Sequence, residues 1–445
     1  MAEIPAPPPR GPSGPVDVLV VGAGAAGLFA ATWAGRTAVA AGRRLSILAI
    51  DSARRLGAKI LVAGGGRCNV THRTVTEADY AGSTPAAIRR VLRRFGVEET
   101  VRFFADAGVE LKREETGKLF PVTDSARTVL DALVREAGRA GVMLVHPAKV
   151  TALARAADGF VADSAAGPFT ARRVILCTGG RSLPKSGSDG SGFALATALG
   201  HSLAEPIVPA LVPLALPSGH WITALAGLTL PAEVTLATAT GRRLHAVTGS
   251  TLCTHVGLSG PAILDMSRHW LVARHADPTV RIALNWLPGT TAEDLDRRLV
   301  AAASRGALSV LREKLADRLA RTLCERAGAA PAGDLARDAR KRLVALVTAT
   351  PLEIAGDRGF AVAEATAGGV PLAEVRLETL ESRVCPGLHL AGEVLDVDGR
   401  IGGFNFQWAW AGGFVAGSAA AAAAIQPGAG TAVDAAAAAG RTSTS

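Results

Sequence analysis

Hydrophobic residues near the start of this chain form short runs that alternate with amphipathic stretches. The apolar run Val16–Val21 predicts a strand buried on both faces, and the apolar run Leu28–Ala34 predicts a helix after it. A second apolar run, Leu45–Ile50, predicts the next strand of the same sheet. Strand, helix and strand in this order are typical of a parallel α/β sheet.

The same alternation continues to about residue 205. We expect a helical stretch broken at Gly96 and a hairpin with its turn near Thr116–Gly117. The expected elements are helices over Ala86–Asp106, Ser125–Ala140 and Phe193–Leu199, the hairpin Val109–Pro121, and strands over Val142–Val145, Val150–Ala156, Gly159–Ala165 and Arg173–Cys177.

The hydrophobic pattern changes near Glu205, where alternating polar and apolar residues and several prolines replace the continuous apolar runs. This pattern predicts a small β-domain. A capping box formed by Thr290 and Glu293 predicts the start of a helical stretch, which Pro351 closes. The strands expected here cover Glu233–Thr238, Arg243–Val247 and Val280–Trp286.

Apolar strands return at Phe360–Ala365 and Leu388–Ala391. We therefore predict an α/β fold: a Rossmann-like nucleotide-binding domain with βαβ units and a central parallel sheet, interrupted by an inserted β-barrel-like and helical domain. The predicted regions are a disordered proline-rich leader (1–15), the first segment of the nucleotide-binding domain (16–205), the inserted substrate domain (206–350), the second segment of the nucleotide-binding domain (351–425) and a flexible tail (426–445).

Glycines at the end of the first predicted strand have the spacing of a dinucleotide-binding turn. Gly22, Gly24 and Gly27 form G-x-G-x-x-G between strand and helix, so that backbone N–H groups and the helix N-terminus can meet a pyrophosphate. Asp51 ends the second strand 24 residues beyond Gly27, where a ribose-binding acid is expected. These residues predict an adenine dinucleotide site; the alternative is a glycine-rich turn of another α/β protein.

Three further glycine-rich segments accompany this turn. The segment Gly64–Asn69 (GGGRCN) predicts either a bare backbone that a flat ligand approaches or a plain flexible loop. The segments Thr178–Gly180 and Gly392–Glu393 each end a predicted strand and belong beside the nucleotide crevice. A helix that starts near Gly403 would offer N–H groups to the N1–C2=O edge of a flavin, where negative charge gathers on reduction.

Composition narrows the classes of partner and compartment. The net charge of +9 is carried by scattered arginine pairs, which solvated helix faces explain, so we expect no nucleic-acid partner. The five cysteines are far apart and form no C-x-x-C, which argues against disulfides, zinc and other metal sites and favours a reducing cytoplasm. The alanine-rich run Gly412–Ile425 is too short and too weakly apolar to span a bilayer alone, so we expect a buried helix and no membrane partner.

Nine motifs, in order from Val16 to about Gly417, resemble the HI0933-like flavoproteins, a family of FAD proteins with two dinucleotide-binding domains. The resemblance implies FAD as cofactor and an FAD-binding domain made from both ends of the chain. The motifs are GAGAAG (22–27), GGGRCN (64–69), GKLFP (117–121), CTGG (177–180), PKSGSDGSG (184–192), PALVPL (209–214), THVGLSGPA (254–262), TAGGV (366–370) and AGEVLDVDGRIGGFNFQWA (391–409).

The resemblance also implies roles for individual residues. Asp51 stands where the family more often has Glu, and should still reach a ribose hydroxyl; Cys177 replaces a more usual Ala, and Lys118 a more usual Arg. The candidate cofactor-binding residues are Gly22, Ala23, Gly24, Ala25, Ala26 and Gly27 for the pyrophosphate, Asp51 for the adenosine ribose, Lys59, then Gly64, Gly65, Gly66, Arg67, Cys68 and Asn69 for the flavin face, Val150 for the adenine through its backbone, Thr178, Gly179 and Gly180 for the crevice, Glu393 for the ribityl chain, and Gly403, Phe404, Asn405 and Phe406 for the isoalloxazine edge.

These features together favour an FAD-dependent oxidoreductase that transfers a hydride between a small organic substrate and flavin N5. The resemblance implies an amine or a conjugated enone as that substrate. Dioxygen or a transiently bound NAD(P)H would be the second redox partner. His255 is the candidate catalytic residue, because its glycine-rich motif could cover the flavin; a structural histidine is equally compatible with the sequence. The alternatives are an FAD-dependent RNA-modifying enzyme and a flavin-bound redox partner without turnover of its own, and the oligomeric state stays open.

Overall fold

The computed structural model describes residues 12, 14–302, 305–329 and 335–426. The chain divides into two compact units: unit 1 comprises residues 1–205 and 368–445, and unit 2 comprises residues 206–367. The predicted leader lies outside the described residues except for residues 12, 14 and 15, and so does the predicted tail except for residue 426. The predicted insertion ends at residue 350, whereas unit 2 continues to residue 367 because strands at 350–352 and 356–357 pair within its sheet.

The main sheet of unit 1 has nine strands. They are β1 (Val16–Val21), β2 (Ile47–Ile50), β7 (Val142–Val145), β8 (Val150–Ala156), β9 (Gly159–Ser164), β10 (Phe169–Leu176), β20 (Val375–Arg376), β21 (Glu381–Ser382) and β22 (Leu388–Leu390). The order β22-β10-β1-β2-β7 is parallel throughout, as in Rossmann-like folds. The prediction of an α/β Rossmann-like fold with a central parallel sheet is therefore confirmed.

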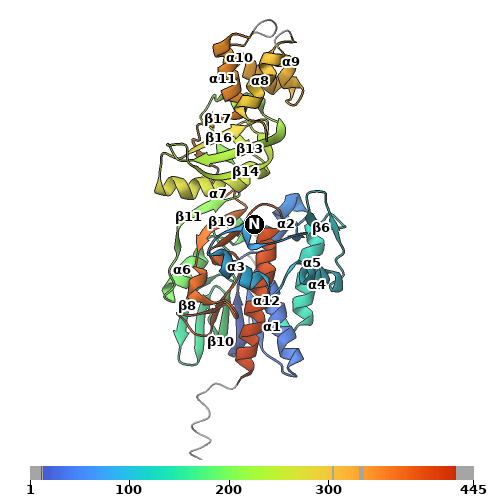
Figure 1. Ribbon diagram of the computed structural model, residues 1–445. Coiled ribbons are helices and arrows are strands. Elements are labelled where there is room, and N and C mark those ends of the chain that lie inside the picture. Colours follow the sequence, from blue (N-terminus) through green and yellow to red (C-terminus); the bar gives the residue numbers. More distant parts are fainter. Residues whose placement is uncertain (1–11, 13, 303–304, 330–334, 427–445) are drawn as a thin grey trace, which may run out of the picture. The chain divides into compact units, whose positions relative to one another are not determined.

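Helices cover this sheet (Figure 1). The helices of unit 1 are α1 (Ala25–Ala40), α2 (Ala58–Gly66), α3 (Pro85–Leu92), α4 (Val97–Asp106), α5 (Ala126–Arg139), α6 (Ser191–Ala198) and α12 (Phe404–Ile425), with single 3-10 turns η1 (Glu77–Asp79), η2 (Pro184–Ser186), η5 (Leu372–Glu374) and η6 (Gly392–Val394). Smaller strands are β3 (Thr71–His72), β4 (Tyr80–Gly82), β5 (Leu111–Arg113), β6 (Lys118–Pro121) and β23 (Val397–Gly399).

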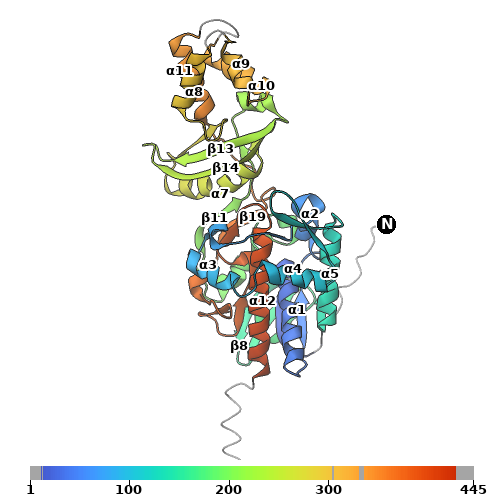
Figure 2. The same cartoon turned by 45° about the vertical axis from the view of Figure 1, so that its right-hand side comes forward.

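Helices α1 and α12 come from opposite ends of the chain and lie side by side (Figures 1 and 2). Glycines make this packing close: a Cβ at Gly413 would lie 2.8 Å from the carbonyl oxygen of Ala26, and a Cβ at Gly417 would lie 2.1 Å from that of Ala30. Burial of the apolar strand β1, where Val18, Leu19 and Val20 are fully buried, completes the core behind them.

Helix α12 spans 22 residues from Phe404, next to the predicted start near Gly403, and contains the alanine-rich run Gly412–Ile425. By length and composition the whole helix could cross a membrane, because the aromatic residues at its start extend it beyond the run Gly412–Ile425, which was expected to be too short to do so alone. In this structure 67% of its most apolar window is buried inside the protein, as expected for a core helix.

Two predictions near residues 290 and 360 need correction. The helix cap is formed by Thr291 with Asp294, whose N–H donates to the Thr291 side chain (3.1 Å), one residue after the predicted Thr290 and Glu293. The predicted strand Phe360–Ala365 is largely turn, and the strand follows it as β19 (Ala365–Gly369), paired with β11 (Ala204–Ala210) where the chain passes between the units.

Unit 2 is an antiparallel sheet with helices. The pairing order is β17-β16-β13-β14-β15-β12-β18, seven strands in a line where the sequence suggested a barrel-like domain. The strands are β12 (Leu214–Ala215), β13 (Thr229–Ala237), β14 (Arg243–Cys253), β15 (Gly257–Ser259), β16 (Arg281–Asn285), β17 (Thr350–Leu352) and β18 (Gly356–Asp357).

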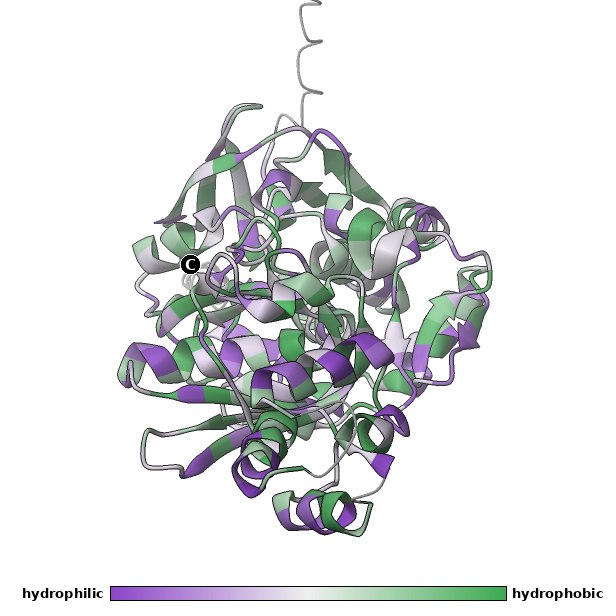
Figure 3. Cartoon of the chain, turned by 90° about the horizontal axis from the view of Figure 1, so that it is seen from above, coloured by the Kyte–Doolittle hydropathy of each residue, from purple (hydrophilic) through white to green (hydrophobic). Residues whose placement is uncertain are grey.

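The helices of unit 2 form two groups. Helix α7 lies along β13 and β14, while the other four helices gather on the side of β16 and β17, which α11 contacts (Figure 1). They are α7 (Pro261–Ala276), α8 (Ala292–Ala301), α9 (Ala307–Arg312), α10 (Asp317–Ala327) and α11 (Arg337–Thr348), with the 3-10 turn η3 (Trp221–Leu225). The Trp286 indole N–H donates to Thr350 Oγ1 (2.7 Å) inside this core. Figure 3 shows hydrophilic (purple) and hydrophobic (green) residues interspersed along the helices of the chain.

Candidate functional site: a nucleotide cradle in unit 1

The turn after β1 has the shape that its glycines predict. Gly22 has φ +96°, and a Cβ there would lie 2.4 Å from the carbonyl oxygen of Cys177; a Cβ at Gly27 would lie 1.8 Å from the carbonyl oxygen of Gly22. Gly24, the N-cap of α1, instead faces open space, with no atom within 4 Å of an added Cβ. The first turn of a helix has N–H groups without intrahelical partners, so this open position suits a phosphate.

Asp51 is tied to that turn. Its Oδ2 accepts a hydrogen bond from the N–H of Ala23 (2.6 Å), and its Oδ1 accepts one from the N–H of Ala53 (2.7 Å). Burial raises the pKa of the Asp51 carboxyl above its ordinary value, although both N–H groups and His146 act to lower it. The acid therefore stands next to the glycine turn, at the place expected for a ribose-binding carboxylate.

Three side chains from distant segments meet at one point. Lys59 Nζ donates to Glu393 Oε2 and to Ser182 Oγ, both at 2.5 Å, and Ser182 Oγ donates to Glu393 Oε1 (2.9 Å). This cluster joins α2, the segment after β10 and η6. A Cβ at Gly392 would lie 2.8 Å from Cβ of Ala26, so the cluster is also fixed beside the N-terminus of α1.

The triple glycine ends the regular part of α2. Ala63, Gly64 and Gly65 leave helical geometry, and all three glycines have positive φ (+58°, +70° and +85°) that other residues rarely adopt. A Cβ at Gly65 would meet nothing within 4 Å, so this backbone is bare.

Asn69, directly after this loop, carries an orphaned polar atom. Its side chain is 8% exposed, and its buried Oδ1 has no hydrogen-bond partner among the described residues. A Cβ at Gly403, the N-cap of α12, would lie 2.9 Å from this oxygen. The triple-glycine loop and the start of α12 therefore adjoin. A buried acceptor without a donor costs free energy, which a ligand N–H group would recover.

The side chains of Arg67 and Cys68, in the same loop, contact other parts of the protein and are not free to bind a ligand. The Arg67 guanidinium pairs with Glu114 (2.6 Å) and lies over the ring of Phe120, with its carbon 4.0 Å from the ring centroid. The Cys68 side chain is fully buried, and burial raises the pKa of its thiol to about 12, so it is no reactive thiolate at neutral pH.

The segment 403–406 offers mainly backbone. Asn405 binds both the N–H and the carbonyl oxygen of Gly399 through its side chain (2.8 Å each). The ring of buried Phe404 stacks on His72, with centroids 5.0 Å apart, and the ring of Phe406 stacks on Trp410. These side chains are engaged, so a ligand would meet the helix N-terminus rather than the side chains of Phe404 and Asn405.

Two more orphaned hydroxyls lie at the carboxyl end of β10. Thr178 Oγ1 and Ser188 Oγ are buried without a hydrogen-bond partner among the described residues. A Cβ at Gly179 would lie 2.7 Å from Ser188 Oγ, which joins the Thr178–Gly180 segment to the Ser188 loop. Val150 begins β8 with a buried side chain, two residues after Ala148, whose N–H donates to the carbonyl oxygen of Asp51 (2.6 Å).

His255 belongs to unit 2. It is exposed in the turn between β14 and β15, where Thr254 Oγ1 accepts the N–H groups of Val256 (3.3 Å) and Gly257 (3.1 Å). The turn is thus fixed by its own hydrogen bonds, and its role in catalysis stays a prediction.

A buried Ser–His–Glu chain elsewhere in unit 1 resembles a hydrolase triad but has another task. His201 lies between Ser382 Oγ (Nε2, 2.8 Å) and Glu374 Oε2 (Nδ1, 2.6 Å). Ser382 is 1% exposed, and its Oγ accepts the N–H groups of Val384 and Cys385. A substrate cannot reach a hydroxyl that is so enclosed. The hydrogen bonds between Ser382, His201 and Glu374 instead hold the end of β21 in place.

The cradle contains residues to which the sequence analysis assigned no role. Ser182 and Ser188 belong to it through the Lys59 cluster and the Gly179 contact. No local pattern marks a serine whose carboxylate partner lies 211 residues away. Lys59 and Glu393 are 334 residues apart, and the pairing of β10 with β22 and the packing of α1 against α12 bring the two halves of the chain together.

The residues of the cradle fit FAD. An open Gly24 at a helix N-terminus suits the pyrophosphate, Asp51 suits a ribose hydroxyl, and the orphaned Asn69 oxygen beside α12 suits a flavin N–H group. The fold and this cradle define the chain as an FAD-dependent oxidoreductase.

The particular family follows from sequence comparison. The family described as HI0933-like protein Rossmann domain matches residues 16–419, and the chain belongs to this family. The resemblance stated from the motifs is thereby confirmed.

Two curated relatives match over nearly their whole length. The chain is 37% identical over 410 residues to a 3-dehydro-bile acid delta(4,6)-reductase of Clostridium scindens, covering 90% of this chain and 98% of the relative. It is 33% identical over 403 residues to a ribosomal RNA dihydrouridine synthase of Escherichia coli, covering 88% and 95%. A solved 3-ketosteroid-delta4-(5alpha)-dehydrogenase from Rhodococcus jostii is 16% identical, with a TM-score of 0.45 and coverage of 94% and 100%.

Proposed function

We propose that this protein reduces a carbon–carbon double bond conjugated to a carbonyl group in a small organic substrate, with NAD(P)H as electron donor. The reactions named for the two curated relatives support this class, because a bile acid dienone and a uracil ring both present such a double bond. Amine oxidation, which the sequence also allowed, has no counterpart in those names.

The structural observation that carries the proposal is the junction of Asn69 with the N-terminus of α12. FAD, when bound, supplies the hydride from N5. The positive end of α12, at Gly403, would stabilise the negative charge that the reduced cofactor bears, and the orphaned Asn69 Oδ1 would accept a hydrogen bond from a ring N–H group. Lys59 and Glu393 hold this wall of the cradle to α2.

The reaction balances as one hydride and one proton per double bond: the hydride goes to the carbon β to the carbonyl and the proton to the α carbon. We propose His255 as a catalytic residue, as its glycine-rich motif suggested; it stands exposed on a fixed turn of unit 2. Substitution by Gln removes the proton but keeps the size and polarity of the side chain.

Anaerobic half-reactions test the proposed reaction. The protein, purified with FAD and reduced with NADPH or dithionite, is mixed with a 4-en-3-one steroid, with its saturated ketone or with a uridine-containing RNA, and flavin reoxidation is followed by visible absorbance. We expect rapid reoxidation by the enone and none by the saturated ketone. Bleaching of the oxidised protein by amines, with no reoxidation by the enone, would contradict the proposal, and reoxidation by RNA alone would identify the RNA-modifying alternative.

A further inference from the structure

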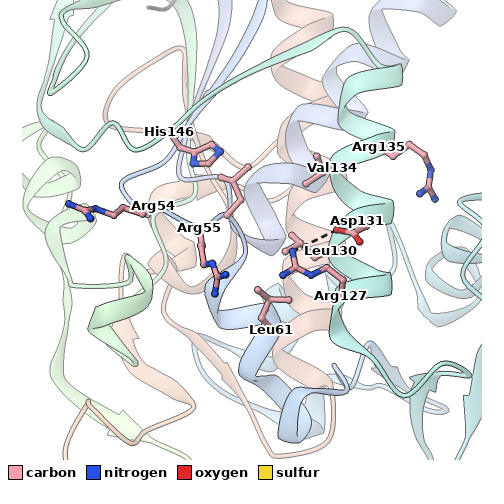
Figure 4. A pocket seen from close by; sticks show the side chains of 10 residues that line it. Arg54, Arg55, Leu61, Arg127, Leu130, Asp131, Val134, Arg135 and His146 are labelled. Carbon is pink, nitrogen blue, oxygen red and sulfur yellow. Dashed lines mark ion pairs between the residues drawn. The ribbon is translucent and has the colours of Figure 1, made fainter. Parts of the chain in front are cut away.

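A pocket of about 420 Å³ lies in unit 1, lined by residues other than those assigned to the cradle (Figure 4). The loop after β2, helix α2, helix α5 and His146 at the end of β7 line it. This volume lies within the range of small-molecule sites. We call it the arginine pocket, because four of its lining residues are Arg54, Arg55, Arg127 and Arg135.

Positive charge dominates the arginine pocket. Asp131 is the acid among its lining residues. Figure 4 shows Arg55 and Arg127 on either side of Leu61, with Arg54 and Arg135 farther out. Guanidinium groups placed on two sides of a cavity bind phosphate through charge-assisted, bidentate hydrogen bonds.

The arginines have few partners of their own. Within the part of the chain that the structure describes, Arg54 and Arg55 form no ion pair. Arg127 faces Asp131 at 4.0 Å, a distance at which an exposed pair contributes little. Arg135 donates to the carbonyl oxygen of Ala107. Arg55 and Arg127 are therefore available for an anion.

The rest of the lining is apolar except for one unpartnered nitrogen. Leu61, Leu130 and Val134 line the pocket beside the arginines. His146 also lines it, and its Nδ1 is buried without a hydrogen-bond partner among the described residues. An apolar wall with one polar atom suits a flat heterocycle better than a bare inorganic ion.

The arginine pocket lies on the other face of α2 from the cradle. Lys59 binds Glu393 in the cradle, while Leu61 lines the arginine pocket. Residues two apart on a helix project about 200° from one another, at 3.6 residues per turn. Leu61 and Lys59 therefore point to different sides of α2, and His146 lies close enough to Asp51 of the cradle to lower the pKa of that carboxyl.

We propose that the arginine pocket binds a nucleoside phosphate, with its phosphate between Arg55 and Arg127 and its base against Leu61 and Leu130, within reach of His146. The site is independent of the proposed reductase reaction, since it rests on other residues. Its ligand is either the 2′-phosphorylated adenosine end of NADPH or a free nucleotide, which differ in where the phosphate is attached.

Calorimetric titration of the full-length, FAD-saturated protein tests this site. The probes are 2′,5′-ADP, 5′-ADP, inorganic phosphate and a short RNA oligonucleotide. The variant Arg55→Gln with Arg127→Gln removes the phosphate donors. The variant Arg93→Gln with Arg94→Gln removes the same charge from exposed arginines elsewhere in unit 1 and is the matched control.

We expect saturable binding of one of the two nucleotides, at least about tenfold weaker in the Arg55/Arg127 variant and unchanged in the control. Tighter binding of 2′,5′-ADP assigns the site to NADPH, and tighter binding of 5′-ADP assigns it to a free nucleotide. Absence of nucleotide binding, equal losses in both variants, phosphate binding as tight as nucleotide binding, or binding of RNA alone would each overturn the proposal. If the double variant does not fold, Arg55→Gln alone gives the same comparison.

Discussion

At the scale of single residues, two glycines of the turn after β1 differ in whether the protein leaves space for a side chain. Gly27 has no room, since its Cβ would lie 1.8 Å from a backbone oxygen, whereas Gly24 has room that the protein does not fill. The first is required by the fold. The second is required only by what binds there.

This difference predicts a separation of stability from cofactor affinity. Gly24→Ala should leave the unfolding free energy of the FAD-free protein unchanged within about 1 kcal/mol, because φ of −79° suits alanine. It should weaken FAD binding at least about tenfold, because the methyl group takes the phosphate's place. Gly27→Ala should lower the unfolding free energy by more than about 2 kcal/mol.

The measurements are flavin fluorescence titration and thermal unfolding of the FAD-free variants. Normal FAD affinity in Gly24→Ala would show that the pyrophosphate does not occupy this position.

At the scale of elements, the contact of α1 with α12 holds the two ends of the chain together. It depends on small residues, since Gly413 and Gly417 let the helix backbones approach. Local propensity would favour alanine over glycine inside a helix, and tertiary packing overrides it here.

Gly417→Ala should therefore destabilise the protein by about 1–3 kcal/mol or more, because its Cβ would lie 2.1 Å from the Ala30 carbonyl oxygen. The matched control is Gly138→Ala in α5, where an added Cβ meets nothing within 4 Å. That control should stabilise by up to about 1 kcal/mol. Urea unfolding of both variants decides the matter, and equal effects of the same sign would contradict the packing argument.

Helix starts show where local pattern is ambiguous. Thr290 with Glu293 and Thr291 with Asp294 have the same capping spacing. The structure selects Thr291, because Asn285 Nδ2 donates to the carbonyl oxygen of Thr290 (3.1 Å) and the Thr290 N–H donates to Leu287, which keeps Thr290 in a turn before the helix. The strand predicted over Phe360–Ala365 was also misplaced by a local pattern. The apolar residues there form a turn, and the strand β19 follows the turn.

At the scale of the whole molecule, the parallel sheet could be predicted from sequence. Strands β1 and β2 are apolar on both faces, β1 is followed by the glycine turn Gly22–Gly27, and β2 is followed by Asp51. The Lys59–Ser182–Glu393 cluster could not, since its hydrogen bonds depend on which distant strands become neighbours. The roles of Asp51 and Gly403 in FAD binding remain predictions, which their positions in the cradle support.

Unit 2 contains a buried histidine, His269, whose protonation should lower the stability of the protein in acid. His245 and His269 stack with centroids 3.7 Å apart, and burial, then the charges of His245 and Arg268, lower the pKa of His269 to about 3 from an ordinary 6.5. Between those values the unfolded chain binds the proton more readily, so the unfolding free energy falls as pH decreases from 6.5 toward 3.

The loss of unfolding free energy between pH 7 and pH 4 should therefore be about 3 kcal/mol smaller in His269→Gln than in the unmodified protein. The measurement is urea unfolding at several pH values, followed by tryptophan fluorescence. His275→Gln, at the exposed end of α7, is the control and should leave the slope unchanged. An unchanged slope in His269→Gln would show that His269 takes up its proton at the same pH in the folded and the unfolded protein.

The origin of the cradle from both ends of the chain has a consequence for biosynthesis. When a ribosome has translated residue 367, unit 2 is complete, yet β10 still lacks its neighbour β22 and α1 lacks the helix that covers it. The folding of the first segment of unit 1 therefore stays incomplete, with apolar surface of α1 exposed, until α12 has left the exit tunnel. FAD is therefore expected to bind only after α12 has folded against α1, and a chain that stops before residue 404 would lack α12 altogether.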